Sequence, residues 1–215
     1  MDGSRDDRTL AFYDRWAHFY DPLVRSIPGV SGVRDAAVDA LGATAGDTVV
    51  DVGCGTGANL ARLREHVGET GRVVGIDASR GMLARARRAG GDAALVRGDA
   101  ARPPVRGGVD AVLASFVVGV LDDAAAAVRA WCDLLEPGNR LVLVEATTSA
   151  GTVGRLANPL FRAFVRAGAP GTPAGAARTL DAAVERAHAA ARERATRCHE
   201  RRLVGGFCSV FVAEM

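Results

Sequence analysis

The stretch VVDVGCGTGAN at residues 49–59 decides the fold of this chain. A β-branched apolar run ends in an acid, and Gly53, Gly55 and Gly57 follow at alternate positions. This pattern predicts a buried strand that breaks into a tight turn and then a helix, because glycine adopts backbone conformations that a Cβ forbids. Glycine also lets the main chain approach a ligand closely. We therefore expect a ligand across the C-terminal end of this strand, where open α/β sheets bind cofactors.

Strand and helix patterns alternate along the chain from residue 48 onward. Such alternation predicts a parallel sheet with helices on both faces. The last two strand-like runs, 196–203 and 207–213, flank Gly205-Gly206 and predict an antiparallel hairpin. The expected fold class is therefore α/β, with a mostly parallel seven-stranded sheet. The other expected strands are 48–52, 72–76, 93–96, 109–115 and 140–146, and the expected helices are 5–27, 31–43, 58–67, 79–89, 122–135, 160–165 and 176–193.

Composition limits the function classes. The 215 residues suit one α/β domain, since such domains commonly reach this size around a single core. The 27 basic and 25 acidic residues nearly balance, and the net charge of +2 predicts no nucleic-acid partner. The four cysteines and four histidines show no metal-ligand spacing, so we expect neither a metal site nor a disulfide framework. No apolar run approaches the roughly 20 residues of a membrane helix, and we expect a cytoplasmic protein.

Two cofactor classes compete for the glycine-rich turn. The spacing G-x-G-x-x-A at residues 53–58 satisfies the loose dinucleotide fingerprint of nicotinamide-dependent enzymes. A pyrophosphate, however, favours a helix N-terminus without acids nearby. Here Asp51, Asp77 and Asp99 stand at the ends of three successive expected strands. Asp77 suits the ribose of either cofactor, whereas Asp51 and Asp99 favour a cationic, phosphate-free adenosyl ligand.

Six segments follow one another in a characteristic order: YDRWAHFYDPL (13–23), DVGCGTGAN (51–59), VVGIDASRGML (73–83), LVRGDAARPP (95–104), VDAVLASFVVGVL (109–121) and LLEPGNRLVLVE (134–145). In order and spacing they resemble the class I S-adenosylmethionine-dependent methyltransferases, and particularly the branch that contains the ubiquinone/menaquinone C-methyltransferases. The chain departs from this family at Pro137-Gly138-Asn139, where relatives usually carry two glycines. Asparagine tolerates the same left-handed turn geometry, so the change is mild.

The resemblance implies S-adenosylmethionine as the cofactor and S-adenosylhomocysteine as the product. It implies that Asp77 binds the ribose, that Asp99 binds the adenine amino group, and that Ser115 and Phe116 lie where the methyl group is delivered. Cys54 is expected as a small packing residue and not as a nucleophile. We assign no catalytic residue. The full set of expected cofactor contacts is Tyr13, Tyr20, Asp51, Gly53, Cys54, Gly55, Gly57, Asn59, Asp77, Ala78, Met82, Asp99, Ala100, Ser115 and Phe116.

The aromatic residues of segment 5–27 allow two interpretations. Tyr13, Trp16 and Tyr20 lie at helical spacing, which by itself fits the buried face of an amphipathic helix. The resemblance instead implies a lid over the cofactor and the substrate. His18 lies off this stripe, and it fits either a solvated histidine or a catalytic base. The substrate-side candidates are Trp16, His18, Phe116 and Phe161.

The resemblance also divides the single domain into parts. We expect an N-terminal helical lid (1–45), a cofactor-binding core (46–146), a substrate-side insertion (147–175), and a final helix with a β-hairpin (176–215). The apolar stretch 156–165 of the insertion fits three environments. It would line a greasy acceptor pocket, touch a membrane surface, or form a lid helix buried on the sheet.

The expected function is methyl transfer from S-adenosylmethionine to a small or lipid-like acceptor, such as a quinone-type ring. Methyl transfer from a sulfonium is an in-line displacement, so the protein's main tasks are alignment and exclusion of water. Three alternatives stay open: a small-molecule O- or N-methyltransferase of secondary metabolism, a non-catalytic cofactor- or partner-binding module, and a nicotinamide oxidoreductase. Peripheral membrane contact is compatible with the sequence, and the oligomeric state is open.

Overall fold

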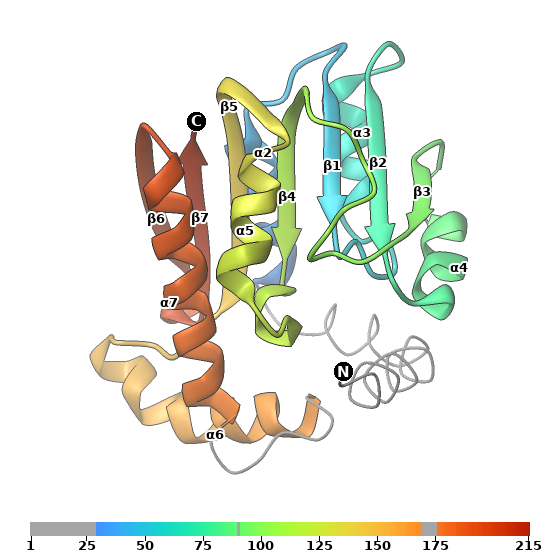
Figure 1. Ribbon diagram of the computed structural model, residues 1–215. Coiled ribbons are helices and arrows are strands. Elements are labelled where there is room, and N and C mark those ends of the chain that lie inside the picture. Colours follow the sequence, from blue (N-terminus) through green and yellow to red (C-terminus); the bar gives the residue numbers. More distant parts are fainter. Residues whose placement is uncertain (1–28, 90, 169–175) are drawn as a thin grey trace.

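The computed structural model describes residues 29–89, 91–168 and 176–215. Its strands are β1 (Thr48–Val52), β2 (Arg72–Asp77), β3 (Ala94–Arg97), β4 (Val109–Ser115), β5 (Leu135–Ala146), β6 (Arg197–Leu203) and β7 (Cys208–Glu214). They form one sheet in the order β3-β2-β1-β4-β5-β7-β6 (Figure 1). Strands β1 to β5 are parallel, whereas β7 pairs antiparallel with both β5 and β6. The expected α/β sheet with its C-terminal hairpin is confirmed.

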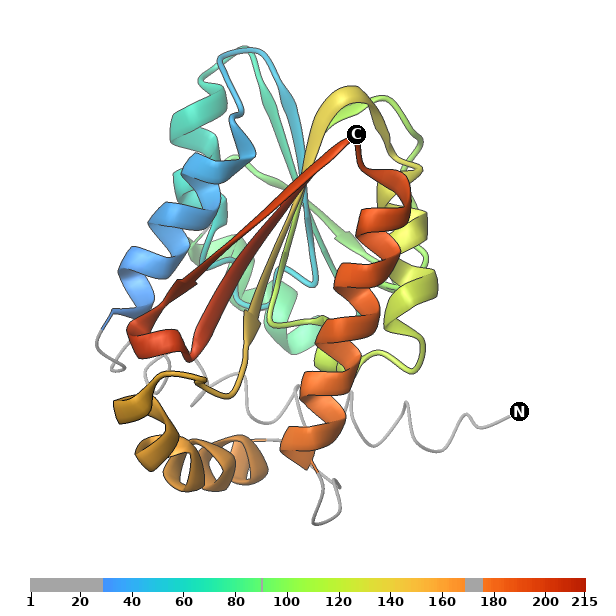
Figure 2. The same ribbon diagram turned by 90° about the vertical axis from the view of Figure 1, so that its left-hand side faces the viewer.

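Helices cover both faces of this sheet (Figure 2). One face carries α2 (Val30–Leu41), α3 (Leu60–Val67) and α4 (Arg80–Ala89), and the other carries α5 (Ala124–Cys132) and α7 (Ala176–Arg194). Helix α6 (Thr152–Gly168) lies beyond the edge at which the parallel strands end. The described 3-10 turns are η1 (Val118–Val120) and η2 (Val204–Gly206).

The strands are apolar on both sides because helices cover both faces. Alternate residues of one strand therefore enter different cores. In β4, Val112 and Ala114 join the core beneath α5 and α7, whereas Ala111 and Leu113 join the core beneath α2 and α3. Trp131 of α5 is fully buried in the first of these cores. A two-residue period thus places each strand between two apolar layers.

Two expected boundaries are wrong. Helix α5 ends at Cys132 and not at 135, and β5 begins at Leu135 and not at 140. The pairing of β5 with β4 shifts register between Val109 and Ala111, so the strand continues across an irregular turn. Gly138 makes this turn with a φ of 88°, a conformation that glycine adopts without steric cost. The turn residues therefore lie inside the strand and do not precede it.

The expected short helix at 160–165 is also wrong, because α6 runs over 17 residues with Pro159 inside it. The segment before α6 holds the helix in place. The Ser149 amide donates to Asn158 Oδ1 at 2.9 Å, and Asn158 Nδ2 donates to the Ser149 carbonyl at 3.0 Å. These two hydrogen bonds stabilise the helix beside Pro159, which lacks a backbone donor.

Most of the expected N-terminal lid lies outside the described residues. Tyr13, Trp16, His18 and Tyr20 belong to residues 1–28, so their proposed roles stay predictions. Helix α2 is the first described element and packs on the sheet beside α3. None of the helices in the described ranges is long and apolar enough to span a membrane.

Candidate cofactor site

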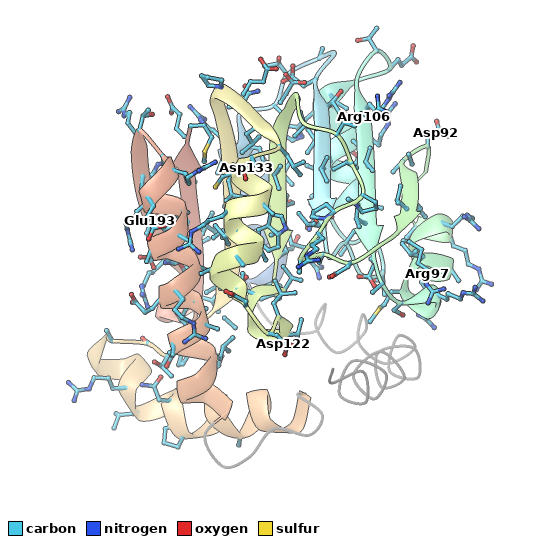
Figure 3. The ribbon with its side chains drawn as sticks, viewed as in Figure 1. Asp92, Arg97, Arg106, Asp122, Asp133 and Glu193 are labelled. Carbon is cyan, nitrogen blue, oxygen red and sulfur yellow. The ribbon has the colours of Figure 1, made fainter. Side chains whose placement is uncertain are left out.

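The candidate site lies at the C-terminal edge of the parallel strands. The chain leaves β1 toward α3 on one face and leaves β4 toward α5 on the other, and such a reversal opens a crevice between the two strands. Arg97, at the end of β3, and Asp122, before α5, lie on the two sides of this edge (Figure 3). The ends of β1, β2 and β4 bring Gly53, Asp77 and Ser115 to this edge, as the sequence predicted.

The turn after β1 leaves open space at its centre. Gly53, Gly55 and Gly57 all have positive φ angles, of 67°, 55° and 81°. A Cβ at Gly53 would lie 2.6 Å from Val117 Cγ2, and one at Gly57 would lie 3.0 Å from Ala86 of α4, so packing explains these two glycines. A Cβ at Gly55 would meet nothing within 4 Å. The space above Gly55 is therefore available to a ligand that approaches the main chain closely.

Asp77 holds the glycine turn in place. The Gly55 amide donates to Asp77 Oδ2 at 2.9 Å, and the Ser79 amide donates to Asp77 Oδ1 at 2.8 Å. The sequence predicted Asp77 as a ligand for ribose hydroxyls. Its second task, fixing the turn that carries Gly55, depends on tertiary contacts.

Asp51, in β1, carries a carboxyl group that is fully buried. Within the described residues, neither its oxygens nor Asn59 Oδ1 accepts a hydrogen bond. Asn59 Nδ2 donates instead to Ser115 Oγ at 3.2 Å, which joins the turn after β1 to the end of β4. Burial raises the pKa of Asp51 to about 7, and the nearby Asn59 amide opposes this shift. Buried acceptors without donors are costly, so this pair fits a cationic, donor-rich ligand group.

The predicted adenine-binding residues converge at the ends of β2 and β3. Asp99 is exposed, and its Oδ1 accepts a hydrogen bond from the Ala101 amide at 2.8 Å. The Ala100 carbonyl accepts one from Trp131 Nε1 at 2.7 Å. Arg97 Nε donates to the Ala78 carbonyl at 3.1 Å, which ties the ends of the two strands together. Met82, at the start of α4, is buried, and its amide donates to Ser79 Oγ at 3.1 Å.

The end of β4 places Ser115 and Phe116 at the crevice. Phe116 has a φ of 58°, which is uncommon for a residue with a side chain, and its amide donates to the Val144 carbonyl at 2.7 Å. Such strained residues cluster at ligand sites. Cys54 lies in the turn opposite, where burial raises the pKa of its thiol far above the ordinary value. A thiol that stays protonated is a poor nucleophile, in agreement with its expected packing role.

Glu145 is a buried acid that the sequence interpretation overlooked. It ends the apolar part of β5 and is almost completely buried. The Val118 amide donates to Glu145 Oε1 at 3.4 Å, and burial raises the pKa of the carboxyl group to about 8. Glu145 thus supports the loop after β4, and Val117 of that loop lies against Gly53. The signal was present in LVLVE, an apolar run that ends in an acid as VVGID does.

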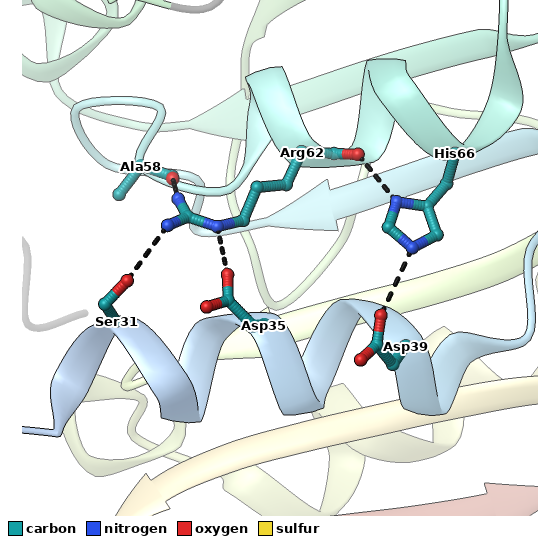
Figure 4. A network of polar contacts seen from close by, with 6 residues as sticks. All are labelled: Ser31, Asp35, Asp39, Ala58, Arg62 and His66. Carbon is teal, nitrogen blue, oxygen red and sulfur yellow. Dashed lines mark hydrogen bonds and ion pairs between the residues drawn. The ribbon is translucent and has the colours of Figure 1, made fainter.

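A polar network braces the glycine turn from the outer side (Figure 4). Arg62 of α3 donates to Asp35 Oδ1 at 2.5 Å, to Ser31 Oγ at 3.2 Å, and to the Ala58 carbonyl at 3.4 Å. His66 Nε2 lies 3.3 Å from Asp39 Oδ1. The network joins α2 to α3 and to the end of the turn. Its members are largely exposed, so each ion pair contributes little stability.

The two substrate-side candidates that the structure describes, Phe116 and Phe161, lie in different parts of the molecule. Phe116 lies at the crevice, whereas Phe161 of α6 packs against Phe207, with 5.1 Å between the ring centroids. Trp16 and His18 lie outside the described residues. Phe161 therefore anchors α6 to the start of β7, and its role toward an acceptor stays a prediction.

Comparison with known proteins identifies the family. Residues 49–138 match a family model described as a methyltransferase domain. A demethylmenaquinone methyltransferase of Shouchella clausii is 32% identical over 170 residues, which cover 75% of this chain and 69% of that protein. The chain belongs to the class I S-adenosylmethionine-dependent methyltransferases. The resemblance inferred from the six sequence segments is confirmed.

Further relatives of this methyltransferase family differ in the acceptor that they name. A demethylmenaquinone methyltransferase of Beutenbergia cavernae is 40% identical over 116 residues, or 54% of this chain and 47% of that protein. Aklanonic acid methyltransferase DauC of a Streptomyces species is 33% identical over 154 residues, or 68% of this chain and 65% of that protein. The chain thus spans from about half to about two thirds of the length of these two curated relatives.

A solved structure supports the fold. The N-methyltransferase NodS of Bradyrhizobium japonicum, in complex with S-adenosylhomocysteine, has a TM-score of 0.67 and 16% identity. The alignment covers 96% of this chain and 97% of that chain. At this identity the likeness shows the shared architecture alone.

Proposed function

We propose that this chain binds S-adenosylmethionine and transfers its methyl group to an apolar, ring-type acceptor. One observation supports the cofactor assignment: no described residue donates a hydrogen bond to the buried carboxyl group of Asp51, in the strand that leads into the glycine turn with its open space at Gly55. A group that brings positive charge and N–H donors would satisfy Asp51 and Asn59 together. The amino acid end of S-adenosylmethionine has this chemistry, whereas a dinucleotide pyrophosphate would add negative charge.

The chain's own residues would hold this cofactor at three points. Asp51 and Asn59 would receive the amino acid end, Asp77 would accept hydrogen bonds from the ribose hydroxyls, and Asp99 would accept one from the adenine amino group. When bound, S-adenosylmethionine supplies a methyl group on a positively charged sulfonium. The protein then has to align the acceptor with that methyl group and exclude water. Ser115 and Phe116, at the end of β4, would form the acceptor side.

The acceptor class rests on the relatives. Two of the three curated relatives are named for demethylmenaquinone, and the third is named for aklanonic acid. We favour a quinone-type acceptor such as demethylmenaquinone. A small-molecule acceptor is the second candidate, because the aklanonic acid methyltransferase covers a larger share of this chain than the relative from Beutenbergia cavernae does. The cytoplasmic location expected from the sequence stays a prediction.

Calorimetry tests the cofactor assignment. S-adenosylhomocysteine should bind with one site per chain, and NAD and ATP should produce no binding heat at the same concentrations. Binding of NAD in preference to S-adenosylhomocysteine would contradict the proposal. Incubation of the protein with a cell extract and a methyl-labelled donor would then identify the acceptor, because the label should enter an apolar, extractable product.

A further inference from the structure

Helix α6 exposes large apolar side chains on one face. The side chain of Leu156 is 84% exposed and that of Leu160 is 76% exposed. The two leucines are four residues apart and therefore lie on the same face of the helix. Pro159 and Ala163 are exposed on this face as well. Leaving two leucines in water is unfavourable, so a partner is expected to cover this face.

The opposite face of α6 is firmly attached to the molecule. The ring of Phe161 packs at a tilt against that of Phe207, and Asn158 exchanges two hydrogen bonds with Ser149. Gly154 is buried so closely that a Cβ there would lie 2.0 Å from Ser149 Oγ and 3.0 Å from the Gly205 carbonyl oxygen. The helix is thus held by one side, and its leucines point outward because the other side is already packed.

The sequence around α6 has an unusual charge. Residues 146–180 contain four arginines, at positions 155, 162, 166 and 178, and no aspartate or glutamate. The whole chain has 27 basic and 25 acidic residues, so without this stretch its net charge would be negative. Three of these arginines, at positions 155, 162 and 166, belong to α6, the helix that exposes the leucines. Basic amphipathic helices with exposed leucines are typical of membrane surfaces that contain anionic lipid.

The position of α6 connects this surface to the candidate site. Both views of the ribbon place α6 beyond the C-terminal edge of the parallel strands (Figures 1 and 2). The glycine turn, Asp77 and Ser115 lie at the same edge. A flat surface that contacts α6 would therefore face the side of the molecule on which methyl transfer is proposed.

We propose that α6 binds the surface of a bilayer that contains anionic phospholipid. The arginines of α6 attract the headgroups, and Leu156 and Leu160 enter the boundary between headgroups and acyl chains. One lipid-facing helix gives reversible binding that weakens as salt is added. The contact does not depend on the cofactor or on methyl transfer, and it would bring the protein to acceptors that dissolve in lipid.

Co-sedimentation of the full chain with vesicles tests this proposal. The wild type should sediment with vesicles of mixed phosphatidylglycerol and phosphatidylcholine and should remain in solution with phosphatidylcholine alone. The double variant L156E/L160E should lower the fraction bound to the mixed vesicles about tenfold, because each glutamate adds a charge at the contact. The matched control is A126E/A189E, which makes the same charge change at two exposed helical positions away from α6.

Three outcomes would overturn the proposal: no sedimentation of the wild type with anionic vesicles, unchanged sedimentation of L156E/L160E, or an equal loss in the control variant. Light scattering tests whether a second copy of this chain, instead of a lipid surface, covers the two leucines. A wild-type dimer that L156E/L160E converts to monomers, without vesicle binding by either, would assign the leucines to self-association. The affinity for S-adenosylhomocysteine is measured on the same samples. If the wild type does not bind S-adenosylhomocysteine, the proposed function is contradicted, but the result with vesicles still stands.

Discussion

The C-terminal edge of the sheet and helix α6 differ in how far contacts within the chain satisfy their residues. At the edge, the groups that shape the turn are bonded within the chain: Gly55 and Ser79 donate to Asp77, and Arg97 donates to Ala78. On α6, Leu156 and Leu160 are largely exposed, and within the described part of the chain they are among the few large apolar residues that are. In the first region, contacts within the chain fix the turn that leaves open space at Gly55. For the second region, we propose a lipid surface as the partner.

Substitution at Gly55 should have the largest effect on the edge region. Gly55→Val places a branched side chain in the open space over the turn, and we expect the affinity for S-adenosylhomocysteine to fall about 100-fold, or by about 2.8 kcal/mol. Calorimetry measures the affinity, and circular dichroism on the same sample checks the fold. Normal binding by the variant would show that Gly55 only forms the turn.

Gly91→Val is the matched control for this experiment. Gly91 has a φ of 57°, against 55° for Gly55, and a Cβ there also meets nothing within 4 Å. Both variants therefore introduce similar backbone strain, but Gly91 lies in the loop before β3, away from the turn. We expect Gly91→Val to lose stability and to retain cofactor affinity. An equal loss of affinity in both variants would assign the effect to strain.

Asp77→Ala removes both a ligand contact and the support of the turn. We expect the affinity for S-adenosylhomocysteine to fall by about 1.5 to 3 kcal/mol, as for the loss of a charge-assisted hydrogen bond. The melting temperature should fall as well, because the amides of Gly55 and Ser79 lose their acceptors. Asp77→Asn keeps one carbonyl acceptor and should recover part of the stability. Unchanged affinity in Asp77→Ala would contradict the ribose assignment.

Glu145 lies between the two regions, and its substitution should affect stability more than affinity. The carboxyl group has a pKa of about 8 in the folded chain against 4.5 ordinarily, so the unfolded chain ionises first as the pH rises. The contribution of Glu145 to folding stability is therefore greatest below pH 4.5 and is lost as the pH rises to about 8. Glu145→Gln cannot ionise, and its stability relative to the wild type should rise by about 2 kcal/mol between pH 5 and pH 7. If the melting temperatures of the wild type and of Glu145→Gln change in the same way across this pH range, Glu145 is not a neutral acid in the folded chain.

The pH dependence of cofactor binding should show the smallest effect. Asp51 has a pKa of about 7 in the free protein, and a cationic ligand prefers its ionised form. Affinity for S-adenosylmethionine should therefore rise about fivefold between pH 6 and pH 7. Asp51→Asn should bind more weakly, without this rise. Asp99→Asn is the control and should keep the wild-type dependence, so a rise that persists in Asp51→Asn would assign it to another group.

Much of the edge region followed from the sequence because its signals are local. The strand, the turn and the first helix are contiguous in residues 48–67, and their periods and glycines identify them without any tertiary contact. The acids Asp51, Asp77 and Asp99 stand at strand ends, and parallel strands bring their ends to one edge. The length of α6 was mispredicted because Pro159 interrupts a helical pattern that the Asn158–Ser149 hydrogen bonds stabilise across the break.

By itself, the sequence determined the alternation of strands and helices, the position of the ligand-binding edge and the family. These depend on residue spacing, which neighbouring residues set. Only the tertiary structure decided that Glu145 is a neutral buried acid, that Asp77 supports the turn, and that Leu156 and Leu160 face outward. Burial and hydrogen bonding depend on segments far apart in the chain: Val118 meets Glu145 across 27 positions, and Gly55 meets Asp77 across 22. Contacts between residues so far apart in the chain produce no periodic pattern in the sequence. The burial and the pKa shifts of these groups can therefore be read only from the folded structure.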